Sequence, residues 1–245
     1  LVGADGRNSK VRESCGIDVW ERAYGQKAIT CLIRHSRSHS NISTEFHRPG
    51  GPFTMVPMPG HVSSIVWVEY DDDADAFMKL RRQDFEQALQ DRTEGCLGTV
   101  HLETMPEAWP LKALRAESLI APRIALMAEA AHVVHPLGAQ GLNLSLRDAA
   151  TLAEEVADAA RNGLDIGSHV ILRQYEFRRR ADILTRSLGT DNLTRMVSND
   201  IGILRHLRRA GLKTVDGIPP LRRFAMHEGV TPGYDDSRLS RGEKL

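Results

Sequence analysis

The feature that most constrains the fold is the run from Arg123 to Asp148. An apolar stretch, Ile124 to Met127, is followed by Glu129, by a turn that contains Pro136, and by helical spacing from about Leu142 to Arg161. A buried strand that ends in a carboxylate and leads through a turn into a helix directs backbone N–H groups and the positive end of the helix dipole toward one ligand edge. This arrangement suits a ring that gains negative charge when it is reduced.

A second segment, at the start of the chain, has a related character. Leu1 to Gly3 has the pattern of a strand end, and Asp5-Gly6 begins a turn that leads into a short basic segment ending at Arg12. Asp-Gly alone is an ordinary turn sequence. Its position upstream of the longer run favours a functional role.

Composition narrows the class of partners. The 245 residues are 41% hydrophobic, enough to bury a core, and 32 Lys and Arg balance 32 Asp and Glu, so no global field favours nucleic acid. No apolar run approaches the roughly 20 residues of a membrane helix, and no signal peptide pattern is present. Three isolated thiols, Cys15, Cys31 and Cys96, fit a reducing compartment. We therefore expect a cytoplasmic protein.

Two histidines near the turn raise the question of a metal. His132 and His135 are three residues apart, and no third ligand accompanies them. We predict no metal site, and we expect His135 to pack or to hydrogen-bond beside the turn.

The middle of the chain is predicted to be rich in sheet. Alternating or β-branched runs, punctuated by Pro and Gly, predict antiparallel strands at Gln26–Arg34, Asn41–His47, Pro52–Met58, Val62–Tyr70, Leu97–Glu103 and Leu111–Leu119. Between them, the spacing of Phe77, Leu80, Phe85 and Leu89 predicts one helix from Asp75 to about Arg92.

The last part of the chain is predicted to be mainly helical. After the helix that stops at Asn162-Gly163, another begins near Ser168, a candidate N-cap, and a short one begins at Pro219. These patterns divide the chain into five stretches: a strand end, turn and basic segment at 1–25, a sheet-rich stretch at 26–120, a strand, turn and helix at 121–163, C-terminal helices at 164–228, and a flexible tail at 229–245.

The run Ala130 to Asp148 resembles, without gaps, a flavin-binding signature of the single-component FAD-dependent aromatic hydroxylases, and Leu1 to Arg12 resembles another. Further segments resemble the ubiquinone-biosynthesis branch of this family: Gly51–Gly60, Ser63–Trp67, Tyr175–Asp182, Asp191–Leu193, Ser198–Asp200 and Ile218–Phe224.

The resemblance implies an α/β (α+β) fold, as in 4-hydroxybenzoate hydroxylase. Residues 1–25 and 121–163 would be part of a Rossmann-like FAD-binding domain, 26–120 an inserted, mainly antiparallel, sheet-rich substrate domain, and 164–228 a helical C-terminal region. The family's Gly-rich first signature would precede Leu1, so the chain would correspond to the C-terminal two-thirds of such an enzyme. The strands at Val2 and at Ile124–Met127 would then have unpaired edges, which predicts self-association of this chain alone.

The resemblance also implies a function. NAD(P)H would reduce FAD, and a flavin C4a-hydroperoxide would transfer oxygen from O2 to a polyprenylated phenolic precursor of ubiquinone. The sheet would act as a lid that excludes water, and no side chain is assigned as a general base. Two alternatives stay open: a noncatalytic or split-subunit binding partner in a biosynthetic assembly, and a flavin oxidoreductase of the same fold without oxygenation.

The resemblance transfers roles to individual residues. Glu129 would hold a ribityl hydroxyl, and the Pro136 backbone would lie against the isoalloxazine near the substrate. Asp5, Gly6 and Arg12 would serve the pyrophosphate region and nicotinamide use. The turn residue Gly138 and the amides of Gly141, Leu142 and Asn143 would complete the cofactor site. The residues assigned to a substrate cavity are Met55, Pro57 and Trp67, although sheet residues of this type are more often plain core.

The chain departs from the family pattern at two places. Ala128-Glu129 stands where the family has Gly-Asp, and Gly138-Ala139 where it has Ala-Gly. An extra methylene and an added Cβ in a packed site cost about 1 to 3 kcal/mol, or roughly tenfold to a hundredfold in affinity. We expect FAD binding to be weakened but not abolished.

Arginines cluster in the helical part, at Arg173, Arg178–Arg180 and Arg186, and again at Arg205, Arg208 and Arg209. A solvated helix face is one interpretation. The other is a docking surface for an acidic partner or an anionic lipid, which would make the protein peripheral to the inner face of a membrane.

Overall fold

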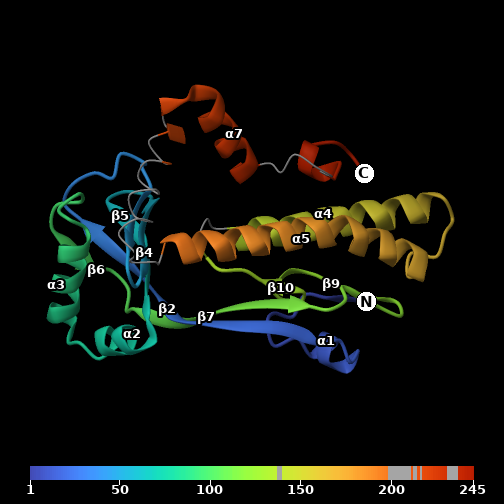
Figure 1. The fold of residues 1–245 in the computed structure, drawn as a ribbon, viewed down its shortest axis with the longest axis horizontal. Coiled ribbons are helices and arrows are strands. Elements are labelled where there is room, and N and C mark those ends of the chain that lie inside the picture. Colours follow the sequence, from blue (N-terminus) through green and yellow to red (C-terminus); the bar gives the residue numbers. More distant parts are fainter. Residues whose placement is uncertain (137–139, 198–210, 212–213, 216, 231–236) are drawn as a thin grey trace. The chain divides into compact units, whose positions relative to one another are not determined.

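The computed structural model divides the chain into two compact units, each described here by itself (Figure 1). The first contains Leu1–Arg22, Lys112–Leu193 and the C-terminal residues, and the second contains Ala23–Leu111. The residues described are 1–136, 140–197, 211, 214–215, 217–230 and 237–245.

A small sheet forms the centre of the first unit. Strand β1 (Val2–Gly3) pairs in parallel with β9 (Ile124–Leu126), and β8 (Ile120–Ala121) pairs with the other side of β9 in antiparallel fashion. The predicted mixed α/β class is confirmed. The expectation that the strand at Ile124 has an unpaired edge is wrong, because β8 occupies the edge that β1 leaves open.

Two long helices complete the first unit. Helices α4 (Gln140–Arg161) and α5 (His169–Val197) lie side by side (Figure 1). Their aliphatic side chains form one core with the small sheet, including Leu126, Leu144 and Leu172. The hydroxyl of buried Tyr175 donates to the Leu126 carbonyl at 2.8 Å, which attaches α5 to β9.

The large sheet has the order β10-β7-β2-β5-β4-β3, with β6 also paired to β2. Its strands are β2 (Val19–His35), β3 (Thr44–Arg48), β4 (Gly51–Met58), β5 (Val62–Tyr70), β6 (Val100–Leu102), β7 (Glu107–Ala116) and β10 (His132–Val133). The pairs β10–β7, β2–β5, β2–β6, β3–β4 and β4–β5 are antiparallel, and Ile29, for example, lies opposite Trp67. Such pairing needs only short connections, as the Pro and Gly punctuation predicts.

One face of this sheet is covered within the second unit. Ile29, Phe53 and Trp67 point to the same face and pack with helices α2 (Asp71–Met78) and α3 (Arg82–Arg92). Because side chains of a strand alternate between faces, the residues between them point to the opposite face.

The single helix predicted at Asp75–Arg92 is in fact two, and it begins at Asp71. Amides at Lys79 and Leu80 donate to carbonyls three residues back, which tightens and ends α2. Phe77 and Phe85 both pack on Trp67, with ring centroids 4.4 and 5.7 Å away. In one continuous helix, side chains eight residues apart point about 80° away from each other. The break between α2 and α3 lets both rings face the sheet.

Several strand ends also differ from the prediction. β2 begins seven residues earlier, at Val19, because its exposed first part has little alternation but pairs within the sheet. β3 begins only at Thr44, since Ser40 and Asn41 adopt positive φ of 51° and 57°, which a strand cannot contain. The predicted strand at 111–119 is β7, shifted to Glu107–Ala116.

The remaining elements are short. They are α1 (Lys10–Ser14), the 3₁₀ turns η1 (Ala128–Ala130) and η2 (Leu239–Arg241), and α7 (Pro219–Val230), which begins at the predicted proline. In the segment predicted to be a flexible tail, Ser237 is buried, and Arg238 bonds Asp158 of α4 at 2.6 Å.

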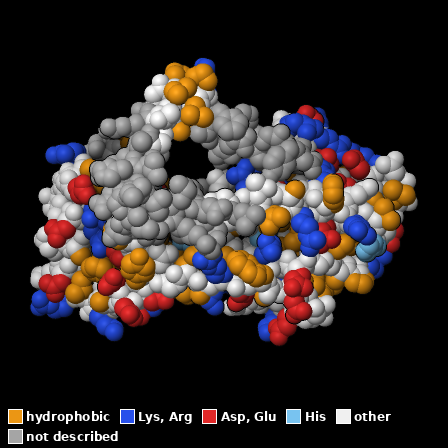
Figure 2. Space-filling model, in the orientation of Figure 1, with side chains coloured by type: hydrophobic (Ala, Val, Ile, Leu, Met, Phe, Trp, Pro, Cys, Tyr) orange, Lys and Arg blue, Asp and Glu red, His pale blue; other side chains and the backbone are white. Residues whose placement is uncertain are grey.

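The described surface carries mixed charge. In the view of Figure 2, basic and acidic side chains are interspersed over the described residues that are visible. No helix of the described residues is long and apolar enough to cross a membrane.

Candidate functional site

Two segments about 120 residues apart meet in the first unit. The Met127 amide donates to the Gly3 carbonyl at 3.0 Å, and Arg12 Nη1 donates to the Ala130 carbonyl at 2.8 Å. The segment after β1 therefore lies beside η1, the turn that carries Glu129. The two sequence runs that predict a single ligand site are neighbours in space.

Asp5 organises the first of these segments. Its carboxylate accepts from the Ser9 hydroxyl at 2.5 Å and from the amides of Lys10 and Val11 at 2.8 and 3.1 Å. The Ser9 hydrogen bond, more than any other contact, lowers the pKa of Asp5. Asp5 thus stabilises the N-terminus of α1, and Gly6 beside it has a φ of 86°, a conformation that favours glycine.

Arg12 faces inward. Its side chain is buried and donates to two backbone carbonyls, those of Ala130 and Arg7. The guanidinium therefore connects the two segments. Its predicted role at the pyrophosphate stays a prediction.

Glu129 is accessible to a ligand. Its side chain is 50% exposed, and its carboxylate lies 3.4 Å from Nε of Arg7, which is itself 41% exposed. An exposed pair at this distance is worth about 0 to 1 kcal/mol, so a ligand hydroxyl can compete for the carboxylate.

Ala128 explains the glycine of the family pattern. Its φ is 55°, in the left-handed region where a Cβ is costly, by about 1 to 2 kcal/mol. Its amide donates to Asp148 Oδ2 at 2.9 Å, which holds the turn in this conformation. Glycine would adopt the same backbone without strain.

Asp148 is the centre of a buried polar network. This fully buried carboxylate accepts from Ala128 N, from His132 Nε2 at 2.6 Å and from Arg179 Nε at 2.8 Å. Burial acts to raise the pKa of Asp148, but the His132 hydrogen bond and the charges of His132 and Arg179 together lower it. The ionised carboxylate therefore ties α4, α5 and the Glu129 turn together.

The arginines of α5 differ from one another in their surroundings. Arg179 is buried, and besides Asp148 it bonds Asp182 at 2.8 Å. Arg178 bonds Glu155 at 2.8 Å, and Arg186 bonds Asp182 at 3.0 Å. Of the consecutive arginines 178–180, only Arg180 is exposed. Arg178, Arg179 and Arg186 therefore stabilise the helix pair, whereas Arg173 and Arg180 are exposed. Arg205, Arg208 and Arg209 lie outside the described residues, and the docking surface stays a prediction.

The first turn of α4 is open to a ligand. Gly141, Leu142 and Asn143 are exposed, Leu142 by 70%, and no acidic side chain lies in this turn. Apart from the adjacent residues and the backbone of the helix itself, no atom of the described residues lies within 4 Å of where a Cβ on Gly141 would be. The half-buried Pro136 is the last described residue before α4, and Gly138 lies outside the described residues.

These features fit FAD. The first-turn amides have no intrahelical partners, and the positive dipole end favours an anionic ring edge. An accessible carboxylate, Glu129, lies in η1, which contacts α4. Donors, acceptor and open space are therefore present on one unit.

The structure places Met55, Pro57 and Trp67, which were assigned to a substrate cavity, on the sheet face that packs with α2 and α3, and their assignment stays a prediction. Met55 and Trp67 are fully buried in the core with α2 and α3, and Pro57 is on the same face. Trp67 lies under the guanidinium of Arg92 at 4.3 Å and donates to Glu69 at 3.1 Å. The plain-core alternative fits these positions.

The opposite face of the same strands is more open. Thr54 and Val56 of β4, and Ser64 and Val66 of β5, alternate with the core residues and are partly or fully exposed. Thr54 is opposite Val66 and Val56 is opposite Ser64, so the four side chains form one patch.

Sequence reasoning missed three residues: Arg7, Asp148 and Arg179. Arg7 lies next to the Asp-Gly turn, and Asp148 ends the long motif, so both stood in segments already singled out. Their partners are about 120 and 31 positions away, and local patterns do not predict such pairs. His132 is a partner of Asp148, and the described residues contain no group of three His, Cys, Asp or Glu side chains able to hold a metal ion.

Comparison with known proteins agrees with this geometry. The profile of the FAD binding domain family matches residues 1–211. Ubiquinone hydroxylase UbiL of Rhodospirillum rubrum is 40% identical over 248 residues, which cover 100% of this chain and 58% of that protein. The mitochondrial ubiquinone biosynthesis monooxygenase COQ6 of Danio rerio is 29% identical and covers 92% of this chain and 54% of that protein.

A solved structure shares the fold. That of p-nitrophenol 4-monooxygenase PnpA from Pseudomonas putida superposes with a TM-score of 0.76 at 17% identity, over 93% of this chain and 57% of that one. The chain spans a little over half the length of the two curated relatives.

Proposed function

The chain belongs to the FAD binding domain family, and from that premise we propose that its protein is an FAD-dependent monooxygenase that hydroxylates a polyprenylated phenolic precursor of ubiquinone, with NAD(P)H and O2 as co-substrates. The observation that carries the proposal is 40% identity to a ubiquinone hydroxylase along the whole chain. The open α4 turn beside an accessible carboxylate supports it.

The chain's own groups would bind and orient the cofactor. Glu129 would accept a hydrogen bond from a ribityl hydroxyl and give up its weak contact with Arg7. The amides of Gly141, Leu142 and Asn143 would donate to the pyrimidine edge of the ring. The carbonyl of Pro136 would face the ring or substrate, since proline has no N–H to donate. Bound FAD would supply the redox chemistry and the activation of O2.

For the substrate, the open sheet face replaces the first assignment. Thr54, Val56, Ser64 and Val66 combine apolar surface with two hydroxyls, which suits a phenolic ring that carries an apolar tail. We place substrate contacts on this patch.

A second candidate is a noncatalytic binding partner, and one observation favours it. Ala128 keeps a strained left-handed backbone where glycine would be unstrained. A partner that no longer binds FAD tightly would tolerate this strain.

A cofactor titration tests the site. The double variant Ala128→Gly, Glu129→Asp removes one Cβ and one methylene from the site, so we expect FAD to bind roughly tenfold to a hundredfold tighter. Quenching of flavin fluorescence on binding measures the dissociation constant of FAD for the variant and for the protein without substitutions. The matched control is Glu117→Asp, which shortens a carboxylate outside the site. An unchanged dissociation constant in the double variant would contradict the assignment of Glu129.

Product analysis tests the activity. The protein purified from its own cell should incorporate one atom of ¹⁸O from labelled O2 into a prenylated phenol in the presence of NAD(P)H. Oxidation of NAD(P)H without label in the product indicates an oxidoreductase, and no turnover with bound FAD indicates the noncatalytic partner.

A further inference from the structure

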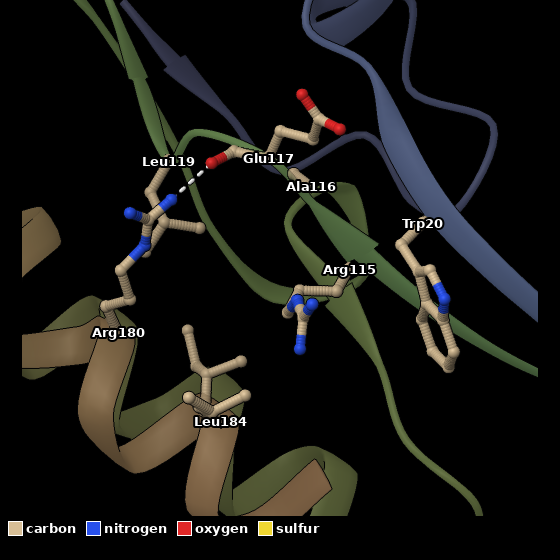
Figure 3. A pocket seen from close by; sticks show the side chains of 8 residues that line it. Trp20, Arg115, Ala116, Glu117, Leu119, Arg180 and Leu184 are labelled. Atoms are coloured by element: carbon tan, nitrogen blue, oxygen red, sulfur yellow. Dashed lines mark hydrogen bonds between the residues drawn. The ribbon is translucent and has the colours of Figure 1, made fainter.

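The first unit contains a cavity that the proposed flavin site does not use. It has a volume of about 530 Å³, within the usual range of small-molecule sites. Trp20 of β2, the end of β7 and the middle of α5 line it (Figure 3). None of its residues is among those proposed to bind FAD.

The lining of the cavity is largely apolar. Ala116, Leu119 and Ile183 are buried beneath it. Trp20 and Leu184, by contrast, remain 46% and 40% exposed although both are large apolar side chains. An apolar or aromatic ligand would remove this surface from water.

Two cations line the same cavity. The Arg115 guanidinium lies over the Trp20 ring, 5.6 Å from its centroid, and Arg180 donates to the Glu117 backbone carbonyl. Figure 3 shows the Arg115 guanidinium projecting between Trp20 and Leu184, while the Glu117 carboxylate points away from it. Within the described part of the chain, neither arginine forms an ion pair with a carboxylate.

Three other arginines of α5 differ from these two. Arg178, Arg179 and Arg186 are all paired with carboxylates at 3.0 Å or less. A half-buried guanidinium stacked on an aromatic ring is well suited to bind a carboxylate, phosphate or sulfonate in bidentate fashion. The cavity therefore combines an unmet positive charge with uncovered apolar surface.

We propose that this cavity binds a single amphiphilic anion, with its acidic head at Arg115 and Arg180 and its apolar or aromatic body against Trp20 and Leu184. Arg115 is directly opposite His132 in the β7–β10 pair. His132 bonds Asp148, so the ligand would lie one strand away from the network that holds the Glu129 turn.

The probe for the test is 8-anilinonaphthalene-1-sulfonate, an aromatic anion whose fluorescence rises in apolar sites. We expect one site per chain, weakened about tenfold or more by Arg115→Met, which removes a charged hydrogen-bond donor. Arg115→Lys keeps the charge and should lose less. Arg173→Met, on an exposed arginine of α5 outside the cavity, is the matched control and should change affinity less than twofold.

Two further arms make the test decisive. The neutral analogue N-phenyl-1-naphthylamine should bind at least tenfold more weakly; equal affinity would overturn the proposal, as would wild-type affinity of Arg115→Met. If Arg115→Met does not unfold cooperatively, Arg180→Met takes its place. Monomeric dodecyl phosphate should displace the probe, whereas displacement by phosphatidylglycerol vesicles alone would indicate a membrane surface and contradict a single-molecule site.

Discussion

The two units are stabilised by different kinds of interior. In the first, an aliphatic core surrounds a chain of buried charges, Asp148, Arg179 and Asp182. In the second, aromatic rings fill the core around Trp67, with one ion pair between Arg92 and Glu69 at 2.6 Å. The stability of a buried charge network depends on every partner being present, whereas the stability of packed rings depends on the volume they fill. The first unit should therefore be sensitive to charge and pH, and the second to side-chain size.

The largest effect should come from Asp148→Asn. Removing this charge leaves Arg179 buried beside a neutral amide, so we expect the unfolding free energy to fall by about 3 to 5 kcal/mol. Urea denaturation measures the loss. Asp158→Asn, a carboxylate half-exposed in its pair with Arg238, is the control and should cost less than about 1 kcal/mol. Similar losses in the two variants would show that burial of the network contributes little.

Replacing Trp67 by a smaller aromatic residue should lower the unfolding free energy by less. Trp67→Phe removes volume between Phe53, Phe77 and Phe85 and deletes the donor to Glu69, at a cost of about 1 to 3 kcal/mol. This loss should not change with pH between about 5 and 8, because no titrating partner of α4 or α5 is involved. Urea denaturation followed by circular dichroism at several pH values measures it. If stability were lost only at one end of that pH range, the second unit would also depend on charge, which would contradict the proposed difference between the two interiors.

Acid should act mainly through the first unit. The pKa of Asp148 is lowered in the fold from its ordinary 3.8, so its ionised form contributes stability above that value and loses it as pH falls through the folded pKa. The unfolding free energy should therefore fall below about pH 4, and less steeply in Asp148→Asn. Parallel curves for the two proteins would show that other carboxylates dominate acid unfolding.

The smallest effect should be a gain in stability. Ala128→Gly relieves the left-handed backbone and should stabilise the first unit by about 0.5 to 1 kcal/mol, after the greater freedom of glycine in the unfolded chain is subtracted. Ala130→Gly, a buried residue of the same turn without positive φ, should destabilise. Differential scanning calorimetry distinguishes the two signs, and destabilisation by both would mean that Ala128 is not strained.

Much of the framework could be predicted from local sequence. The strand at Ile124, the helix to Arg161 and the start of α7 at Pro219 follow from apolar spacing and from turn residues. The meeting of Asp5-Gly6 with Glu129 followed from the resemblance and agrees with the hydrogen bonds between their segments. Local spacing did not predict the break between α2 and α3, because it depends on two phenylalanines reaching one tryptophan.

The residues assigned to the substrate illustrate a second limit of local patterns. The strand pairing places Met55, Pro57 and Trp67 on one face of neighbouring strands. The alternation of side chains along a strand does not tell which face of the sheet the helices cover. Moving the assignment by one residue along the strand therefore exchanges a core position for an exposed one. The open patch at Thr54, Val56, Ser64 and Val66 is the result.

The sequence by itself determined the strand and the helix of the flavin-binding run and the acidic residue between them, because these depend on residues close in the chain, and its composition determined the balance of charge. Only the tertiary structure decided that adjacent Arg179 and Arg180 differ, one buried against Asp148 and the other at an open cavity. Successive residues of a helix point about 100° apart, so the element that packs on each side decides whether a charge is buried in an ion pair or lies at an open cavity. That element comes from distant parts of the chain.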